Sequence, residues 1–299
     1  MSSLTLRPGR SMMLLICIFI FMFIVSSLIS SFILGRMTDT TAAIRIATVI
    51  QDLFIFVLPP LVTAVLSSRL PARWLCIERS PRPLMLFGAI AILIVAMPCL
   101  NVVVEFNKSI VLPDALRPLE EAMQKMEEAA QASIDAMMKG ASVWSMIVSV
   151  LIIGILAGFS EELFFRGGFQ RIMMSFKINP HLAIWVTALI FSAFHFQFYG
   201  FLPRTLLGAY FGYLVFWTRS LWIPIIVHAF NNTVVVVSTW MSANNLTKVE
   251  IDSVGVDLSR VSNVLYVIFS LLLTIIGLWL FVRFSRRAVP GCVPDQPKS

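Results

Sequence analysis

Long apolar runs constrain this chain more than any other feature of its sequence. The first, Ser11–Leu34, has 24 residues without a charge, and a helix of about 20 apolar residues spans the hydrocarbon core of a bilayer. Seven more runs follow: Ile46–Ser68, Pro83–Val104, Ser142–Phe165, Ile178–Gly200, Phe201–Thr218, Leu221–Met241 and Val261–Val282. Only 13% of the residues are charged, about half the share of a soluble domain, and the mean hydropathy is +0.88. These features exclude a soluble globular protein and predict an all-α polytopic membrane protein with about eight transmembrane helices.

Two of these runs allow a second interpretation. Ser11–Leu34 follows two arginines, as a secretory signal peptide does, but it is longer than the usual apolar region of about 7–15 residues and lacks a small-residue cleavage site. We therefore expect it to be a retained helix. Phe201–Thr218 is short and has Arg204 and Arg219 near its ends, so it fits a half-length or tilted helix as well as a full span.

The basic residues predict the orientation of the chain. With both termini on one side, 14 of the 23 Lys and Arg residues fall on that side and nine on the other. Basic loops are retained in the cytoplasm, which predicts a multi-pass protein of a bacterial cytoplasmic (inner) membrane with both termini cytoplasmic. Anionic lipid head groups account for the net charge of +7, so we predict the bilayer, and no nucleic acid, as the partner of this charge.

The predicted spans divide the chain into five segments. Residues 1–104 form an N-terminal three-helix part, 142–241 a core, 242–260 a loop, and 261–299 the last helix and a cytoplasmic tail. Residues 105–141 lie outside the bilayer and have one face rich in glutamate. Apolar side chains recur at helical spacing on the opposite face: Leu119, Met123, Met126, Ala130, Ile134 and Met137. This segment predicts an amphipathic helix. It either rests on the membrane surface or the bundle, which we favour, or acts as a lid over a cavity.

Ionisable residues inside spans are rare and are candidates for function. On a helix Glu162 and Arg166 are four residues apart and can pair, whereas Glu161 lies about 100° around the axis. A carboxylate held by a guanidinium would leave the other free to act as a general base. A surface ion pair at the end of the helix explains the same residues. Asp52, in the second run, is interpreted as a structural or pathway-lining residue, and the sequence suggests no mechanism for it.

Two histidines complete the polar set. His195 lies near the end of the fifth run, where a lone histidine on an apolar helix is usually a packed residue. His228 and Asn232 share one face of the seventh run, and both can donate hydrogen bonds to an oxygen that gains negative charge. Polar contacts between helices are the alternative.

Taken together, these residues resemble three motifs of a known family. Glu161-Glu162-x-x-x-Arg166, Phe191-x-x-x-His195 and His228-x-x-x-Asn232 occur in the order found in the CAAX protease and bacteriocin-processing family, also called CPBP or Abi, and span 72 of the 299 residues. The resemblance implies an eight-helix intramembrane endopeptidase with a conical active-site cavity open toward the cytoplasm. It further implies that Glu161 and His195 activate a water, that His228 and Asn232 stabilise the oxyanion, and that Glu162 and Arg166 orient the base.

The resemblance also bears on cofactors and partners. The favoured mechanism needs no cofactor, while zinc held by Glu161, His195 and His228 is the alternative. The implied partner is a peptide or protein substrate, with or without a lipid anchor. A non-catalytic membrane protein that binds peptides, confers immunity or acts as a scaffold is the competing interpretation. A proton-coupled transporter is less favoured because no paired broken helices are seen.

Overall fold

Helices make up the architecture of the chain. A computed structural model describes residues 6–138, 142–247 and 256–285, and no β-strand occurs among them. The helices are α1 (Pro8–Arg36), α2 (Thr40–Gln51), η1 (Asp52–Val57), α3 (Leu58–Ser67), α4 (Pro71–Trp74), α5 (Pro83–Lys108), η2 (Asp114–Leu116), α6 (Arg117–Met138), α7 (Val143–Ser149), η3 (Val150–Leu156), α8 (Ala157–Glu162), η4 (Leu163–Gln170), α9 (Arg171–Ser175), α10 (Pro180–Ala193), η5 (Phe198–Gly200), α11 (Phe201–Thr218), α12 (Trp222–Ala243) and α13 (Val261–Ser285).

Several of these helices are long enough to cross a membrane. In the described part of the chain, six are both long and apolar enough: Pro8–Arg36, Thr40–Ser67, Pro83–Lys108, Val143–Ser175, Trp222–Ala243 and Val261–Ser285. The prediction of an all-α polytopic membrane protein is therefore confirmed. The count of eight is not, because the two remaining runs form α10, a helix of 14 residues, and α11, which carries Arg204 in its first turn.

Two predicted boundaries near the polar motifs are wrong. The fourth run continues past Phe165 as one helix of 33 residues, Val143–Ser175, because Gly167 and Gly168 are accommodated between tightly packed neighbours. The fifth run does not reach Gly200 as a helix. Instead, α10 ends at Ala193, and a turn over residues 194–196 leads to η5. Phe196 in that turn has a φ of 52°, a left-handed conformation that does not continue an α-helix.

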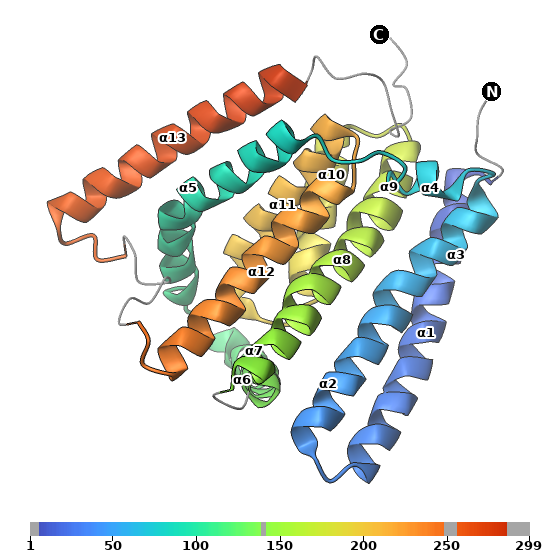
Figure 1. Cartoon of the computed structure of the whole chain (residues 1–299), viewed down its shortest axis with the longest axis horizontal. Coiled ribbons are helices and arrows are strands. Elements are labelled where there is room, and N and C mark those ends of the chain that lie inside the picture. The colour runs from blue at the N-terminus through green and yellow to red at the C-terminus, as the bar shows by residue number, and fades with distance from the viewer. Residues whose placement is uncertain (1–5, 139–141, 248–255, 286–299) are drawn as a thin grey trace.

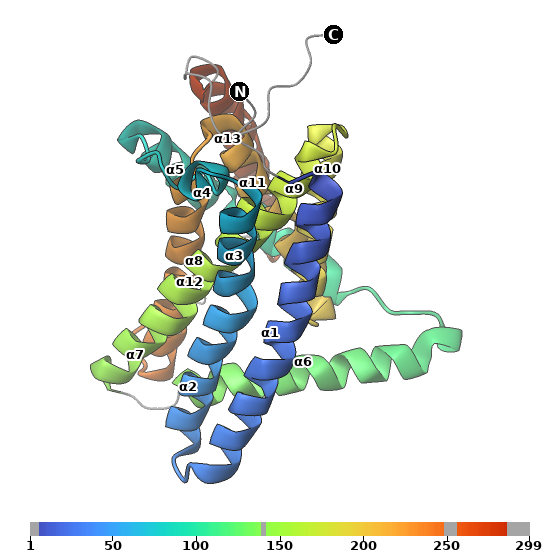
Figure 2. The ribbon, with the colours of Figure 1, turned by 90° about the vertical axis from the view of Figure 1, so that its right-hand side faces the viewer.

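The helices pack into a bundle with α8 and α12 at its centre. Figure 1 shows α1, α2 and α3 along one side and α5 and α13 along the other. An aromatic cluster joins the first side to the centre, where the Phe164 ring lies 5.1 Å from Phe19 of α1 and 5.7 Å from Phe56 of η1. The start of α1 and the end of α13 lie at the same end of the bundle in both views (Figures 1 and 2).

The predicted amphipathic helix is confirmed as α6. Figure 2 shows it lying across the opposite end of the bundle and extending beyond it. At its last turn the Arg45 guanidinium of α2 donates to the Met137 carbonyl, and Arg45 Nη2 lies 2.7 Å from Ser145 Oγ of α7. Met137 is buried there, whereas Leu119 and Met126 remain exposed. One end of α6 thus rests on the bundle, as the favoured interpretation expects.

Candidate active site

Glu161 and Glu162 lie in the middle of the helix Val143–Ser175. They end α8, and a π-helical stretch lies on either side, η3 before and η4 after. A π turn is wider than an α turn and is frequent at functional sites. The pair is therefore enclosed by the bundle rather than placed at a helix end.

Two glycines let α12 approach these carboxylates closely. A Cβ on Gly158 would lie 2.8 Å from the Ala229 nitrogen, and one on Gly154 would lie 2.6 Å from Thr233 Oγ1. Gly154 and Gly158 form a Gly-x-x-x-Gly pattern, which favours close helix packing in membranes. The backbone contact at Ala229 places the preceding residue, His228, beside Glu162.

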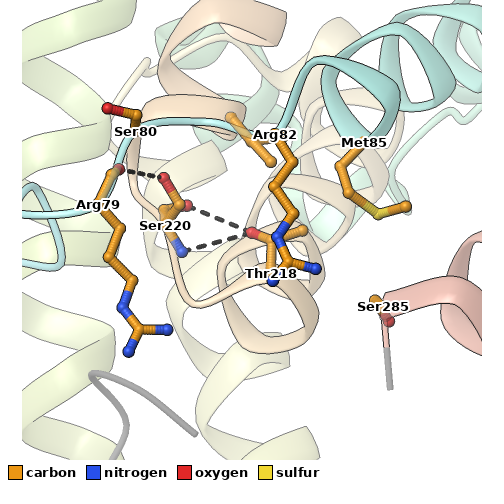
Figure 3. A pocket seen from close by; sticks show the side chains of 8 residues that line it. Arg79, Ser80, Arg82, Met85, Thr218, Ser220 and Ser285 are labelled. Carbon is orange, nitrogen blue, oxygen red and sulfur yellow. Dashed lines mark hydrogen bonds between the residues drawn. The ribbon is translucent and has the colours of Figure 1, made fainter. Parts of the chain in front are cut away.

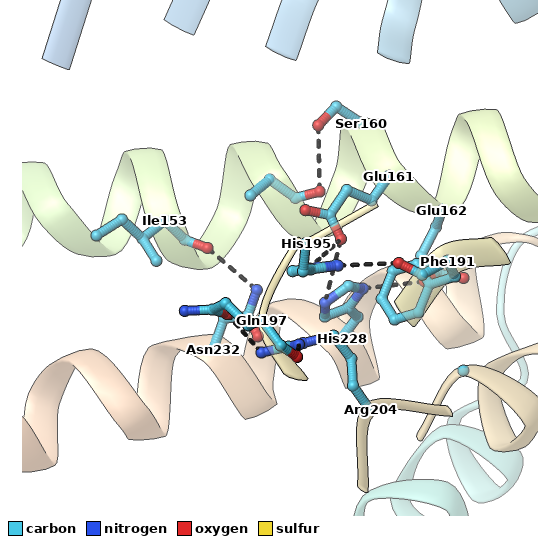
Figure 4. Close-up of polar contacts among 12 residues, drawn as sticks. Ile153, Ser160, Glu161, Glu162, Phe191, His195, Gln197, Arg204, His228 and Asn232 are labelled. Carbon is cyan, nitrogen blue, oxygen red and sulfur yellow. Dashed lines mark hydrogen bonds and ion pairs between the residues drawn. The ribbon is translucent and has the colours of Figure 1, made fainter. Parts of the chain in front are cut away.

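Glu162 accepts two charged hydrogen bonds through one oxygen. Its Oε1 lies 2.7 Å from Arg166 Nη1 and 2.9 Å from His228 Nδ1 (Figure 4). Glu162 and Arg166 have fully buried side chains, so the alternative of a surface ion pair is wrong. A buried charge needs such partners, because an isolated one costs several kcal/mol.

The Arg166 guanidinium is held by the surrounding helices. Its Nη2 donates to the Gly208 carbonyl at 2.7 Å, and its Cζ lies 4.5 Å from the centre of the Phe191 ring. A Cβ on Gly208 would lie 3.0 Å from Phe191, so this glycine allows α11 to approach α10. Arg166 thereby connects η4, α10 and α11 around Glu162.

His195 lies in the turn after α10, not on a helix as its spacing predicted. Its Nδ1 is 2.9 Å from the Phe191 carbonyl oxygen, and its Nε2 is 3.9 Å from Glu161 Oε2. A carbonyl oxygen only accepts hydrogen bonds, so Nδ1 carries the hydrogen and Nε2 presents its lone pair in the neutral ring. The turn thus directs a proton acceptor toward Glu161.

Glu161 faces both histidines. Its Oε2 lies 3.9 Å from His195 Nε2 and 3.8 Å from His228 Nε2, and it is buried without a hydrogen-bond partner among the described residues (Figure 4). Nδ1 of each histidine ring donates to another group, so both Nε2 atoms and Glu161 Oε2 are hydrogen-bond acceptors. These three acceptors face one another unless one of them holds a proton. Gaps of this length suit a bridging water. The arrangement can therefore bind a water or share a proton.

Asn232 lies one turn after His228 on α12. Its Nδ2 donates to the Ile153 carbonyl of η3 at 3.2 Å, and its Oδ1 accepts from Asn231 Nδ2 at 3.3 Å. The second amide hydrogen of Asn232 is not used by either contact. The side chain is thereby oriented by η3 on the same side of α12 as the glutamates.

Sequence reasoning missed Arg204. The sequence places it near one end of the run Phe201–Thr218 and suggests no role in the site, yet its side chain points toward the cluster, where Nη2 donates to Gln197 Oε1 at 2.6 Å (Figure 4). Its charge interacts with those of Glu161 and Glu127. The signal was available, because an arginine within an apolar run is costly. Asp52, also buried, interacts electrostatically with Glu161 from η1.

The described residues do not form a ready metal site. Among them, no three His, Cys, Asp or Glu side chains are arranged to hold a metal ion. His228 Nδ1 is committed to Glu162, and the Nε2 atoms of both histidines lie 3.8–3.9 Å from one oxygen of Glu161. Catalytic zinc commonly uses three such ligands at about 2.0–2.2 Å from the ion, which places the ligand atoms about 3.3–3.6 Å from one another. The zinc set of Glu161, His195 and His228 stays a prediction.

Comparison with known proteins identifies the part of the chain that carries this site. No curated protein and no solved structure matches the chain. Residues 143–234 match the family model described as type II CAAX prenyl endopeptidase Rce1-like. This range contains all three motifs. The resemblance to the CAAX protease and bacteriocin-processing family is thus confirmed over residues 143–234.

Proposed function

We propose that this protein is an intramembrane endopeptidase of the CAAX prenyl protease type. The observation that carries the proposal is the position of Glu161 Oε2, 3.9 Å and 3.8 Å from two histidine nitrogens, next to a glutamate that is fixed by Arg166. Glu161 Oε2 is free to exchange protons, whereas Glu162 Oε1 accepts from both Arg166 and His228. A general base must be able to take a proton from the reacting group.

The first step is the activation of a water. A water between Glu161 Oε2 and His195 Nε2 donates a hydrogen bond to each and keeps a lone pair for the scissile carbonyl carbon. As the water oxygen bonds to that carbon, Glu161 takes its proton. The proton then passes to the peptide nitrogen as the carbon–nitrogen bond breaks. This yields a carboxylic acid and a free amine, and water is the only co-reactant.

The second requirement is a donor for the oxyanion. His228 in its protonated form donates from Nε2, and Glu162 stabilises that imidazolium through the 2.9 Å bond to Nδ1. The remaining amide hydrogen of Asn232 supplies a second donor. Removing one such donor typically lowers turnover by about 10²–10³. Glu162 and Arg166 are positioning residues in this scheme.

An apolar substrate group fits beside these residues. A cavity of about 240 Å³ lies between α5, α12 and α13, lined by Leu93, Met97, Phe230 and Asn231 among others. Neither His228 nor Asn232 is among its described lining residues, but Asn231 of the lining donates to the Asn232 oxygen at 3.3 Å, which connects the cavity to a proposed oxyanion donor. The proposed partner is a peptide or protein with an apolar or lipidated segment, presented from the bilayer.

Cleavage of a quenched fluorescent peptide tests this function. The purified chain is assayed with prenylated and unprenylated peptide, beside Glu161→Gln and Glu161→Ala, with and without a zinc chelator. We expect chelator-resistant cleavage that both variants abolish. Cleavage that survives in both variants would remove Glu161 as the base, and chelator-sensitive cleavage would require a metal in the mechanism. No cleavage of either peptide, together with their tight binding, would favour the non-catalytic peptide-binding interpretation.

A further inference from the structure

A second polar pocket lies away from the glutamate–histidine cluster. It has a volume of about 280 Å³ and lies where the loop before α5, the turn between α11 and α12, and the end of α13 meet (Figure 3). Arg79 and Arg82 line it from the first of these, Thr218 and Ser220 from the second, and Ser285 from the third. None of the residues described above for hydrolysis lines it.

The pocket carries net positive charge. Arg79 and Arg82 belong to its lining, and no Asp or Glu is found among its described lining residues. Met85 and Ile223 supply an apolar part of the wall. Arginine presents a planar set of donors that suits phosphate and carboxylate oxygens. The expected ligand is therefore an anion attached to an apolar group.

Hydrogen bonds fix the rim of the pocket before any ligand binds. Ser220 Oγ donates to the Arg79 carbonyl at 3.0 Å (Figure 3). Thr218 Oγ1 donates to the Leu214 carbonyl at 2.6 Å. The Trp222 indole donates to the Ile77 carbonyl at 2.9 Å. The bonds to the Arg79 and Ile77 carbonyls hold the loop before α5, and the bond of Thr218 lies within the last turn of α11.

The pocket lies at the level of a membrane surface. It is formed at the ends of three apolar helices, namely the first residues of α5 and α12 and the last of α13. Trp217, Trp222 and Trp279 lie near these same ends, and the Arg283 guanidinium is 5.3 Å from the Trp279 ring. Tryptophan and arginine gather where lipid head groups meet the hydrocarbon core.

We propose that this pocket binds a phosphate group, supplied by the head group of an anionic phospholipid. Its volume corresponds to roughly nine water molecules, more than a bare phosphate ion fills. A glycerol phosphate head group uses that space, with its phosphate at Arg79 and Arg82 and its acyl chains along the apolar helices. Anionic lipids attract arginines at this level of the membrane.

Titration of the full-length chain in detergent tests the proposal. Native mass spectrometry measures binding of short-chain phosphatidylglycerol and of phosphatidylcholine with the same acyl chains, and calorimetry measures inorganic phosphate. The variants are Arg79→Gln with Arg82→Gln, and Arg82→Gln alone, whose side chain is exposed. Arg283→Gln is the matched control, since it removes an arginine at the same level outside the pocket lining.

We expect the double variant to weaken phosphatidylglycerol binding by about 30-fold and the single variant by about fivefold, as follows from losing two or one arginine contacts. Arg283→Gln should leave phosphatidylglycerol binding nearly unchanged. Phosphatidylcholine binding should be nearly the same in the original chain and in all variants. If the double variant lost binding of inorganic phosphate but kept that of phosphatidylglycerol, the result would support the phosphate site and assign it a soluble ligand. Equal binding of both anions by the original chain and a folded double variant, judged by melting temperature, would overturn the proposal.

Discussion

Glu162 and His228 are joined by a 2.9 Å hydrogen bond between Oε1 and Nδ1, deep in the bundle. Arg166 donates to the same oxygen at 2.7 Å, so one atom of Glu162 connects a guanidinium to an imidazole. Because Nδ1 is engaged, the ring presents Nε2 toward Glu161, 3.8 Å away. A carboxylate paired with a histidine in this way fixes the orientation of the ring.

Adjacent glutamates should therefore respond differently to the same change. We expect Glu162→Gln to lower the free energy of unfolding by about 3–5 kcal/mol, because it leaves the buried Arg166 charge without its carboxylate. Glu161→Gln should leave the melting temperature nearly unchanged, since Glu161 Oε2 has no hydrogen-bond partner among the described residues. Thermal unfolding in detergent measures both. Equal losses for the two variants would contradict the division of roles.

Asn232→Ala should lower turnover by about 10²–10³ with little change in substrate binding, if its free amide hydrogen stabilises the oxyanion. The comparison of kcat with KM makes this test. Thr239→Ala is the control, because Thr239 is an exposed residue of the same helix whose hydroxyl donates to the Val235 carbonyl. A rise in KM with an unchanged kcat would assign Asn232 to substrate positioning instead.

Gly158→Ala should reduce both stability and hydrolysis. The added methyl group would lie 2.8 Å from the Ala229 nitrogen, so α8 and α12 must separate, and overpacking of this kind costs about 1–3 kcal/mol. The shift also moves His228 away from Glu162. Gly35→Ala is the matched control, since nothing lies within 4 Å of a Cβ there. If Gly158→Ala behaved like Gly35→Ala in unfolding and cleavage assays, close helix approach would not be what positions His228.

The contact between α6 and η5, which follows the turn that carries His195, gives a fourth prediction. The Tyr199 amide donates to Glu127 Oε2 at 3.1 Å, and Gln124 Nε2 donates to the Tyr199 hydroxyl at 2.8 Å. We expect Glu127→Ala to speed hydrogen exchange of the Tyr199 amide by about tenfold or more, the effect of losing a bond to a charged group. Glu128→Ala, its exposed neighbour, should not. Unchanged exchange at Tyr199 in Glu127→Ala would show that α6 does not hold η5.

Local patterns in the sequence were sufficient for the helices and for one ion pair. Apolar runs of bilayer length predicted the polytopic helical class, and helical spacing predicted both α6 and the pairing of Glu162 with Arg166. These features depend on residues within one helix, where a period of 3.6 residues fixes which side chains are neighbours. The numbers of Lys and Arg residues in the loops also predict that both termini are cytoplasmic. This orientation stays a prediction.

The convergence of the site was decided by tertiary structure. Glu161 was expected to face away from Glu162, and it does, but only the packing of α12 and the turn after α10 bring His228 and His195 to it. The turn at Phe196, the π-helical stretches around Glu161 and the inward position of Arg204 depend on contacts between distant segments. A sequence determines which faces are apolar and which residues repeat along one helix. Which polar groups then meet depends on how closely helices approach one another, and here glycines at contacts such as that of Gly158 with Ala229 set that distance.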